Sequence, residues 1–376
     1  MADVINWLLG IAAGVLTAEK VDSHYGYYFQ DFTAISDEAA EILGRRRKNL
    51  VLDGLTQLSD KAAEGLSRHV GDLHLHRLTN VTEKAAGNLG KNKGDLYLTG
   101  LTQLSDKAAE GFSKHEGALY LNALKNLSDA AAVSLGKNQG DLYLNSVIEL
   151  PEKVAEGLSK HKGNLFLYSV TSLSDEAADS LSKHEGMLYL HNVKCLSDAA
   201  AKSFSRHEGS LHLQTLIHVS DAAVASLGQH KGNLYLNSVT HMSNEAAQSF
   251  RTHEGEVYLQ GLAHLSNVAA ESLGKNKGNL QLDGLTQLSD EAADSFSTHV
   301  GDLYLQGLTH LSDAAAASLA KHKGSLFLNV LLSLSDVAFK SLCNNKHVYW
   351  PQSGAPYCAH PRMKDSNNPK KPENVA

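Results

Sequence analysis

The chain has 376 residues, of which 42% are apolar and 20% are charged, so it carries enough apolar side chains to bury a core and lacks the composition of a disordered protein. A formal net charge of -7 and a sequence pI near 6.3 leave no general excess of basic side chains for neutralising phosphates, which excludes nucleic acid as an expected partner. The three cysteines, Cys195, Cys343 and Cys358, are too few for a disulfide scaffold or a paired zinc site, although Cys343 and Cys358 are candidates for one disulfide.

Residues 1 to 26 begin with an apolar run from Val4 to Ala18, which Asn6 interrupts. Four apolar residues of this run fall on one face of a helix: Val4, Leu8, Ile11 and Val15. We therefore expect a helix that caps the first repeat, with a signal peptide or membrane anchor as the alternative. Asp3 and the absence of a preceding Lys or Arg oppose a signal peptide, and the run is short for a transmembrane span of ~20 residues. These features favour the cytoplasm over a secreted or cell-envelope location.

Positions 27 to 348 form fourteen consecutive units of 23 residues, which begin at Tyr27, Leu50, Leu73 and so on to Leu326 without insertion or deletion. One unit runs from Leu119 to Asp141, and its neighbours follow the same plan. A fixed period of this length is typical of a solenoid, in which each unit buries its apolar face only by stacking on its neighbours. Positions within a unit are numbered 1 to 23 below.

Each unit opens with Leu-x-Leu at positions 1 and 3 and a polar residue at position 4, the alternation of a strand with one buried face. A strand of about four residues cannot stand alone, so successive strands must pair in a parallel sheet.

A short outer helix is expected in the second half of each unit. It begins with Ser-Asp at positions 10 and 11, as in Ser59-Asp60, where the hydroxyl caps free backbone N–H groups. Gly at position 22 is expected to end this region and turn the chain back, and positions 1, 3, 6, 9, 13 and 17 are expected to form the core. Six acid-first pairs lie at i,i+4 spacing along the helices: Glu41/Arg45, Glu64/Arg68, Glu110/Lys114, Glu156/Lys160, Asp179/Lys183 and Glu271/Lys275.

The Leu-x-Leu-x-x-Leu segment, the Leu-Ser-Asp-x-Ala-Ala-x-x-Leu segment and the 23-residue period resemble bacterial leucine-rich repeats, especially ribonuclease-inhibitor-like repeats with a helical outer side. Two features depart from that family: position 6 is Leu or Val where the family usually has buried Asn, and the leucine three residues before Leu-x-Leu is absent. The resemblance implies an α/β solenoid, a right-handed superhelix with a parallel sheet on the concave side and short helices on the convex side. It also implies recognition of a ligand through the concave face.

Position 2 is aromatic in ten of the fourteen units and faces away from the core, with a mainly amide or acidic position 4 beside it. One interpretation is a stabilising ladder of identical rings on strands ~4.8 Å apart, and the other is a rigid amphipathic binding surface. The two are compatible. The candidate partner-binding residues are Tyr97, Tyr120, Asn122, Tyr143, Asn145, Phe166, Tyr168, Tyr189, His191, Tyr235, Asn237, Tyr258, Gln260, Tyr304 and Gln306.

Position 20 is His in nine units and Asn in four, as in His161 and Asn138. Asn does not replace His as a transition-metal ligand, whereas both residues offer a hydrogen-bonding δ atom and both tolerate a left-handed backbone, so we expect a structural column. A second histidine group lies at position 8, on a loop edge: His218, His241, His264 and His310. These columns, and the pair His74 and His76, lead us to expect no metal site and no cofactor.

The sequence has no nucleophile elbow, phosphate loop, zinc-protease helix or paired catalytic carboxylates, so we expect no enzyme. The expected function is a binding scaffold for a protein, peptide or glycan, and the alternative is a structural or cell-envelope array without a single ligand site. Membrane association is expected only if residues 4 to 18 act as an anchor. Residues 349 to 376 are expected to form a C-terminal cap and a flexible tail.

Overall fold

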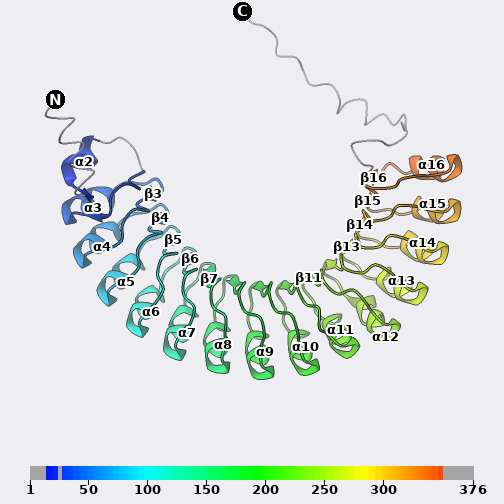
Figure 1. Cartoon of the computed structure of the whole chain (residues 1–376), viewed down its shortest axis with the longest axis horizontal. Helices are drawn as coiled ribbons and strands as arrows, with labels where there is room; N and C mark the ends of the chain where they lie inside the picture. Colours follow the sequence, from blue (N-terminus) through cyan, green and yellow to red (C-terminus); the bar gives the residue numbers. More distant parts are fainter. Residues whose placement is uncertain (1–13, 24–27, 350–376) are drawn as a thin grey trace, which may run out of the picture. The chain divides into compact units, whose positions relative to one another are not determined.

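The computed structural model describes residues 14–23 and 28–349, and positions 1–13, 24–27 and 350–376 lie outside the description (Figure 1). The described chain falls into two compact parts, with the boundary between Asn237 and Ser238. These parts are called the first and the second unit below, and each 23-residue segment is called a repeat. Each unit is an α/β solenoid, in which parallel strands line the inner side and short helices the outer side. This confirms the predicted fold class. Within the described residues, no helix is both long enough and apolar enough to span a bilayer.

The first unit opens with β1 (Val15–Leu16), α2 (Ala18–Ser23) and β2 (Ala34–Ile35), and β1 pairs in parallel with β2. Its main sheet then follows chain order through β3 (Leu50–Val51), β4 (Leu73–His74), β5 (Leu96–Tyr97), β6 (Leu119–Tyr120), β7 (Leu142–Tyr143), β8 (Leu165–Phe166), β9 (Leu188–Tyr189), β10 (Leu211–His212) and β11 (Leu234–Tyr235). Its outer helices are α3 (Asp37–Leu43), α4 (Asp60–Leu66), α5 (Glu83–Leu89), α6 (Asp106–Phe112), α7 (Asp129–Leu135), α8 (Glu152–Leu158), α9 (Asp175–Leu181), α10 (Asp198–Phe204) and α11 (Asp221–Leu227).

The second unit repeats this plan. Its strands are β12 (Val257–Tyr258), β13 (Leu280–Gln281), β14 (Leu303–Tyr304), β15 (Leu326–Phe327) and β16 (Val348–Tyr349). Its helices are α12 (Asn244–Gln248), which the 3-10 helix η1 (Ser249–Thr252) continues, α13 (Asn267–Leu273), α14 (Asp290–Ser297), α15 (Asp313–Leu319) and α16 (Asp336–Cys343).

The register of the sheet follows the repeat, because position-1 residues pair with the residue 23 places later, as Leu96 does with Leu119. The last pair is the exception, since Leu326 pairs with Val348, 22 places later. The strands contain two residues, where the sequence led us to expect about four. The N–H of position 3 still completes the ladder, as Leu98 donates to the Tyr120 carbonyl at 3.0 Å, but the chain turns immediately afterwards. The first repeat departs from the others, since Tyr28 makes only an isolated bridge to Val51.

The terminal segments are only partly described. Val15, which we expected on the face of a capping helix, lies in strand β1 instead, and the other three residues of that face lie outside the described residues. The C-terminal segment is described as far as β16, and Cys358 and the expected tail lie beyond it.

The outer helices begin as expected, at an N-cap hydroxyl, except for α8, whose N-cap residue is Pro151. Ser59 accepts a hydrogen bond from the Ala62 N–H at 2.9 Å, and the same contact recurs along both units. The N-cap hydroxyl also donates to the acidic or amide residue at position 11 of the preceding repeat, as Ser59 does to Asp37 at 2.5 Å and Ser197 does to Asp175. One serine therefore caps its own helix and joins it to the next.

The core differs from the expected set in one column. Position 9 is mostly half-buried, as at Leu58 and Leu127, because it lies next to the N-cap, where the chain leaves the interior. Position 14 is buried instead: Ala63 and Ala132 are 0% exposed and lie beside the buried alanine at position 13. Positions 13, 14 and 17 thus form the inward stripe of each helix.

The glycine column acts differently from the prediction. Apart from Gly14, no described residue has a positive φ, so Gly at position 22 supplies no left-handed turn. The backbones of neighbouring repeats instead approach each other closely at this column. A Cβ on Gly163 would lie 2.5 Å from the Gly140 carbonyl oxygen, a distance that no side chain tolerates.

Four of the six expected ion pairs form on the helices. Their N–O distances are 2.9 Å for Glu41–Arg45, 4.0 Å for Glu156–Lys160, 2.9 Å for Asp179–Lys183 and 2.5 Å for Glu271–Lys275. Arg68 reaches Glu41 of the preceding helix at 3.7 Å rather than Glu64. These side chains are largely exposed, so the pairs contribute little to stability.

Candidate binding surface

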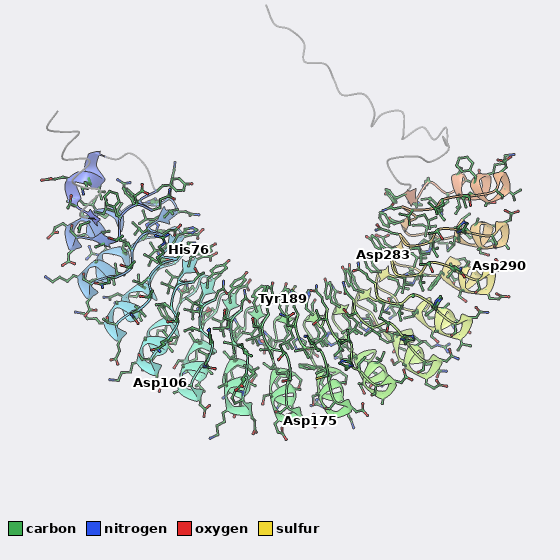
Figure 2. All side chains as sticks on the ribbon, in the orientation of Figure 1. His76, Asp106, Asp175, Tyr189, Asp283 and Asp290 are labelled. Carbon is green, nitrogen blue, oxygen red and sulfur yellow. The ribbon has the colours of Figure 1, made fainter. Side chains whose placement is uncertain are left out.

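The two faces of each repeat carry different side chains. Figure 2 shows His76 and Tyr189 on the sheet side of the first unit, and Asp106 and Asp175 on its helical side. In the second unit, Asp283 lies on the sheet side and Asp290 on the helical side. The helical-side aspartates accept hydrogen bonds from the N-cap serines and so have a structural role, whereas the candidate residues lie on the sheet.

In the first unit, the position-2 rings form one uninterrupted stack from His74 to Tyr235. Successive ring centroids lie 3.9–4.2 Å apart and the rings are nearly parallel. Parallel strands in register set this spacing, because they place equivalent Cβ atoms about one strand separation apart. Each ring in the interior of the stack has both faces covered by its neighbours, so only ring edges and hydroxyl groups face outward. The column thus forms a continuous ladder of stacked rings.

Three tyrosines of this stack, Tyr120, Tyr143 and Tyr189, stay protonated at neutral pH. Burial raises the pKa of Tyr120, Tyr143 and Tyr189 above the ordinary value, and contacts with the Tyr143 and Tyr97 hydroxyls add to the effect at Tyr120. The outer edges of these three rings thus carry neutral hydroxyl groups that both donate and accept hydrogen bonds.

A second layer of rings covers part of the stack. Tyr168 and His191, at position 4, stack on each other with centroids 4.2 Å apart. Tyr168 meets Phe166 edge to face at 5.9 Å, and His191 meets Tyr189 and His212 at 5.7 Å each. We call these five residues the aromatic cluster: Phe166, Tyr168, Tyr189, His191 and His212. Phe166 and His212 are nearly buried, at 7% and 8% exposure, because the second layer lies over them.

The aromatic cluster carries no charge at neutral pH. Burial lowers the pKa of His191, and burial together with the neighbouring His191 lowers the pKa of His212 to about 4. A surface of neutral rings with polar edges favours a partner that presents apolar groups and hydrogen-bonding groups together.

The amides beside the stack are less available than the sequence suggested. Asn122 and Asn145 are half-buried, and their Oδ1 atoms are shielded from water with no hydrogen-bond partner among the described residues. Asn237 is also half-buried, next to Tyr235 at the end of the stack. These amides border the rings and do not form a separate exposed strip.

In the second unit, the candidate residues contact neighbouring side chains that are not among the candidates. The Tyr258 hydroxyl donates to Glu256 at 2.6 Å, and the Gln260 amide donates to Asp283 at 3.3 Å. Tyr304 stacks on Phe327 at 4.3 Å, and Gln306 accepts from the Asn329 amide at 2.7 Å. The register places Gln281 between Tyr258 and Tyr304, so these two tyrosines do not share a stack.

The histidines at position 20 lie inside the solenoid, which confirms the structural interpretation of that column. His161, His184 and His207 are at most 2% exposed, and their rings stack at 5.9 and 6.2 Å. The expected left-handed backbone is absent from the column. The asparagines of the column bond instead to the preceding repeat, as Asn92 Nδ2 donates to the His69 carbonyl at 2.9 Å.

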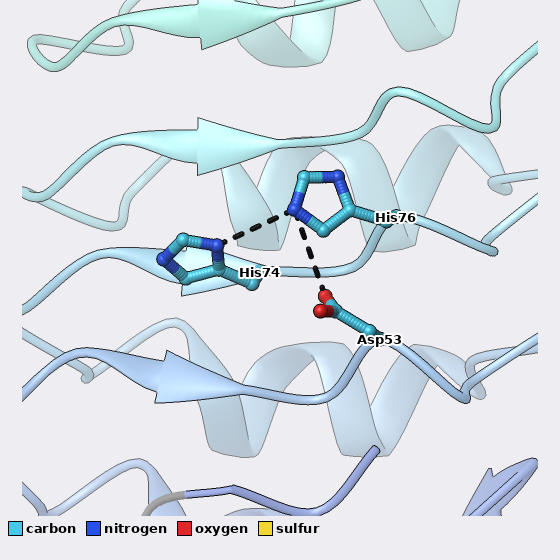
Figure 3. Close-up of side chains that lie close together, drawn as sticks. All are labelled: Asp53, His74 and His76. Atoms are coloured by element: carbon cyan, nitrogen blue, oxygen red, sulfur yellow. Dashed lines mark hydrogen bonds and ion pairs between the residues drawn. The ribbon is translucent and has the colours of Figure 1, made fainter. Parts of the chain in front are cut away.

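Two features of the sheet face escaped the prediction. His212 lies within the aromatic cluster, although we did not include it among the candidate residues. Asp53 lies beside His74 and His76 (Figure 3), a grouping that follows from the register because positions 53 and 76 differ by 23.

Neither a model of a protein family nor a curated protein matches the sequence. Solved structures do match. An internalin from Listeria monocytogenes is similar with a TM-score of 0.54 and 16% identity, over 85% of this chain and 90% of that chain. The chain has the leucine-rich-repeat fold. A chain of the Toll–Spatzle complex from Drosophila gives a TM-score of 0.57 and 14% identity, over 84% of this chain and 51% of that one. A leucine-rich-repeat protein from Leptospira interrogans gives a TM-score of 0.49 and 20% identity, over 81% of this chain and 90% of that one.

Proposed function

We propose that this leucine-rich-repeat protein is a non-enzymatic binding scaffold that recognises a protein or peptide through the sheet face of its first unit. The aromatic cluster carries this proposal. A stack on its own stabilises the sheet, but the second layer formed by Tyr168 and His191 interrupts the regular Tyr-x-Asn pattern and adds rings above the stack. Rigid aromatic side chains with polar edges are typical anchors of protein interfaces.

The arrangement of the rings favours a peptide over a glycan. A sugar binds aromatic residues by placing its apolar face on an open ring face, whereas the rings within this stack are about 4 Å from a neighbour on each side. The outward groups are hydroxyls and ring edges, which suit the mixed polar and apolar surface of a polypeptide. The similarity to a chain of a complex between proteins agrees with this class of partner.

A structural array remains the second candidate function, because the stack and the serine-to-aspartate contacts join successive repeats without any ligand. The two functions differ in what they require of the second layer. A structural array needs the position-2 stack and does not need Tyr168 or His191 to face outward.

Selection on the full chain tests the proposal with defined probes, a displayed library of random peptides and an array of glycans. Peptides selected by the wild type should lose binding to the double variant Tyr168→Ser/His191→Ser by tenfold or more, since anchor residues dominate interface energies. The matched control Lys137→Ser/Lys160→Ser changes two exposed helical-side residues and should bind every selected peptide as the wild type does.

Thermal melting of both double variants shows whether they stay folded. Three results would contradict the proposal: selected peptides that bind both double variants equally, selection of glycans alone, or no selection from either collection. Loss of stability in the Tyr168→Ser/His191→Ser variant without loss of binding would favour the structural array.

A further inference from the structure

We propose that Asp53, His74 and His76 form a zinc site on the sheet face of the first unit. His74 ends strand β4 and His76 follows two positions later, in the turn after the strand, where its ring lies beside that of His74 (Figure 3). Asp53 follows β3 and lies opposite His76, since Val51 pairs with His74. One ligand atom from each of the three residues lies within 4.8 Å of the other two (Figure 3).

The distances between the donor atoms suit a tetrahedral metal. His74 Nδ1 and His76 Nε2 are 3.4 Å apart, and His76 Nε2 is 3.7 Å from Asp53 Oδ1. A tetrahedral zinc with bonds of 2.0–2.1 Å separates its ligand atoms by about 3.4 Å. Two imidazoles and a carboxylate are ligands that zinc accepts, and three protein ligands leave a fourth position for water or for a donor atom of a partner.

Neighbouring residues hold these ligands as a metal site requires. The Oγ1 of Thr99 lies 2.8 Å from His76 Nδ1, so with Nδ1 protonated His76 donates to the threonine and its Nε2 lone pair faces Asp53. The ring of His74 stacks on Tyr97 with centroids 4.2 Å apart and an angle of 5° between the planes, which limits its rotation. The metal would therefore meet ligands that are already oriented.

The site is accessible from the sheet face. The side chains of His76 and Asp53 are 37% and 32% exposed, so the site opens on the sheet face and is not sealed in the core. The other histidine pair of this face, His191 and His212, sits among neutral rings, and the described residues contain no further group of three potential ligands with this spacing.

Without metal, the same contacts are a hydrogen bond between two histidines and a weak ion pair to Asp53. Calorimetric titration of the tag-free full chain with zinc chloride distinguishes the two cases, and titration with cobalt reports the geometry through its visible absorption. We expect one zinc per chain in the wild type and a cobalt spectrum typical of tetrahedral coordination.

Four variants locate the bound zinc. His76→Ala should abolish binding of this equivalent, and Asp53→Asn, which keeps the side-chain shape, should weaken it by tenfold or more. Thr99→Val leaves every ligand in place and should cost tenfold to a hundredfold in affinity, because it removes the partner that orients His76. His218→Ala/His310→Ala removes two histidines of the position-8 column and should leave the titration unchanged.

Zinc should also raise the melting temperature of the wild type and of the His218→Ala/His310→Ala variant, but not that of His76→Ala, because a ligand stabilises the state that binds it. The proposal is overturned if the wild type binds no zinc at equimolar concentration. It is equally overturned if His76→Ala and Asp53→Asn, shown to be folded by circular dichroism, retain one equivalent with wild-type affinity.

Discussion

His184 and His207 lie one above the other in the interior of the first unit, with ring centroids 6.2 Å apart and parallel planes within 8°. Burial, followed by the charges of His161 and His207, lowers the pKa of His184 to about 3, and burial lowers the pKa of His207 to about 4. The ordinary value is 6.5. Both imidazoles are therefore neutral at physiological pH, and protonating either one inside the solenoid is unfavourable.

The first prediction is that stability decreases in acid well before the carboxylates titrate. The unfolded chain protonates these histidines near pH 6.5 and the folded chain only near pH 3 to 4, so the unfolded state binds more protons between these values. The stabilisation is complete above pH 6.5 and declines as the pH falls toward 4. Each unit of pKa difference corresponds to about 1.4 kcal/mol, so several buried histidines together should unfold the chain in this range.

Denaturant titrations at a series of pH values measure this effect. The double variant His184→Asn/His207→Asn is the matched control, because asparagine occupies the same column at Asn138 and does not titrate in this range. Its stability should depend less steeply on pH than that of the wild type. Identical profiles for the two proteins would show that the buried histidines do not cause the acid sensitivity.

The second prediction concerns Asn92, which is 2% exposed and donates from Nδ2 to the His69 carbonyl at 2.9 Å. Asn92→Leu keeps a similar volume but removes the donor, and should cost about 1–3 kcal/mol by leaving a buried carbonyl unsatisfied. Asn92→His should cost less, because both neighbouring repeats already hold a histidine at this position. Denaturant midpoints give the comparison, and equal stability of the leucine and histidine variants would contradict this role of the amide.

Much of the fold was predictable because the same sequence pattern recurs in every repeat. The alternation around Leu119, the serine N-caps and the 23-residue register were all legible in one repeat and reinforced by the others. The roles of Gly163 and Leu58 were not, since a close approach between repeats and the depth of a side chain depend on how successive repeats stack. The sequence pattern predicts the structure of a single repeat, but not how closely one repeat packs on the next.

The sheet face was predictable as a set of columns but not as a set of contacts. Period-two alternation places Tyr168 and His191 on the same face as Tyr189, whereas their edge-to-face packing depends on side-chain rotation. The position-20 column shows the same limit. His and Asn were expected to supply equivalent δ-position hydrogen bonds. The asparagines bond to a carbonyl, and Nδ1 of His230, His299 and His322 also lies within hydrogen-bond distance of a backbone carbonyl. His161 and His184 instead stack without a hydrogen-bond partner among the described residues.

The third prediction tests the ring stack. Tyr143 lies 4.1 Å from Tyr120 and 4.0 Å from Phe166, so Tyr143→Ala removes two stacking contacts and should cost about 1–3 kcal/mol beyond the lost burial. Tyr143→Phe keeps both contacts and should remain close to the wild type. As a further control, Tyr28→Ala changes a tyrosine that is 70% exposed and should change stability little. Equal unfolding free energies for Tyr143→Ala and Tyr28→Ala would show that the stack contributes no stability.

The last prediction compares two glycines that the same substitution should affect in opposite directions. Gly87 lies inside helix α5, and a Cβ there would meet nothing within 4 Å, so Gly87→Ala should stabilise the protein by about 0.5–1 kcal/mol through its higher helix propensity. Gly163 lies where two repeats approach, and its added Cβ would be 2.5 Å from the Gly140 carbonyl oxygen. Gly163→Ala must therefore separate the two backbones and should cost more than 1 kcal/mol. Thermal and denaturant unfolding of both variants measure the contrast, and a Gly163→Ala protein as stable as Gly87→Ala would show that the repeats do not need a glycine where they meet.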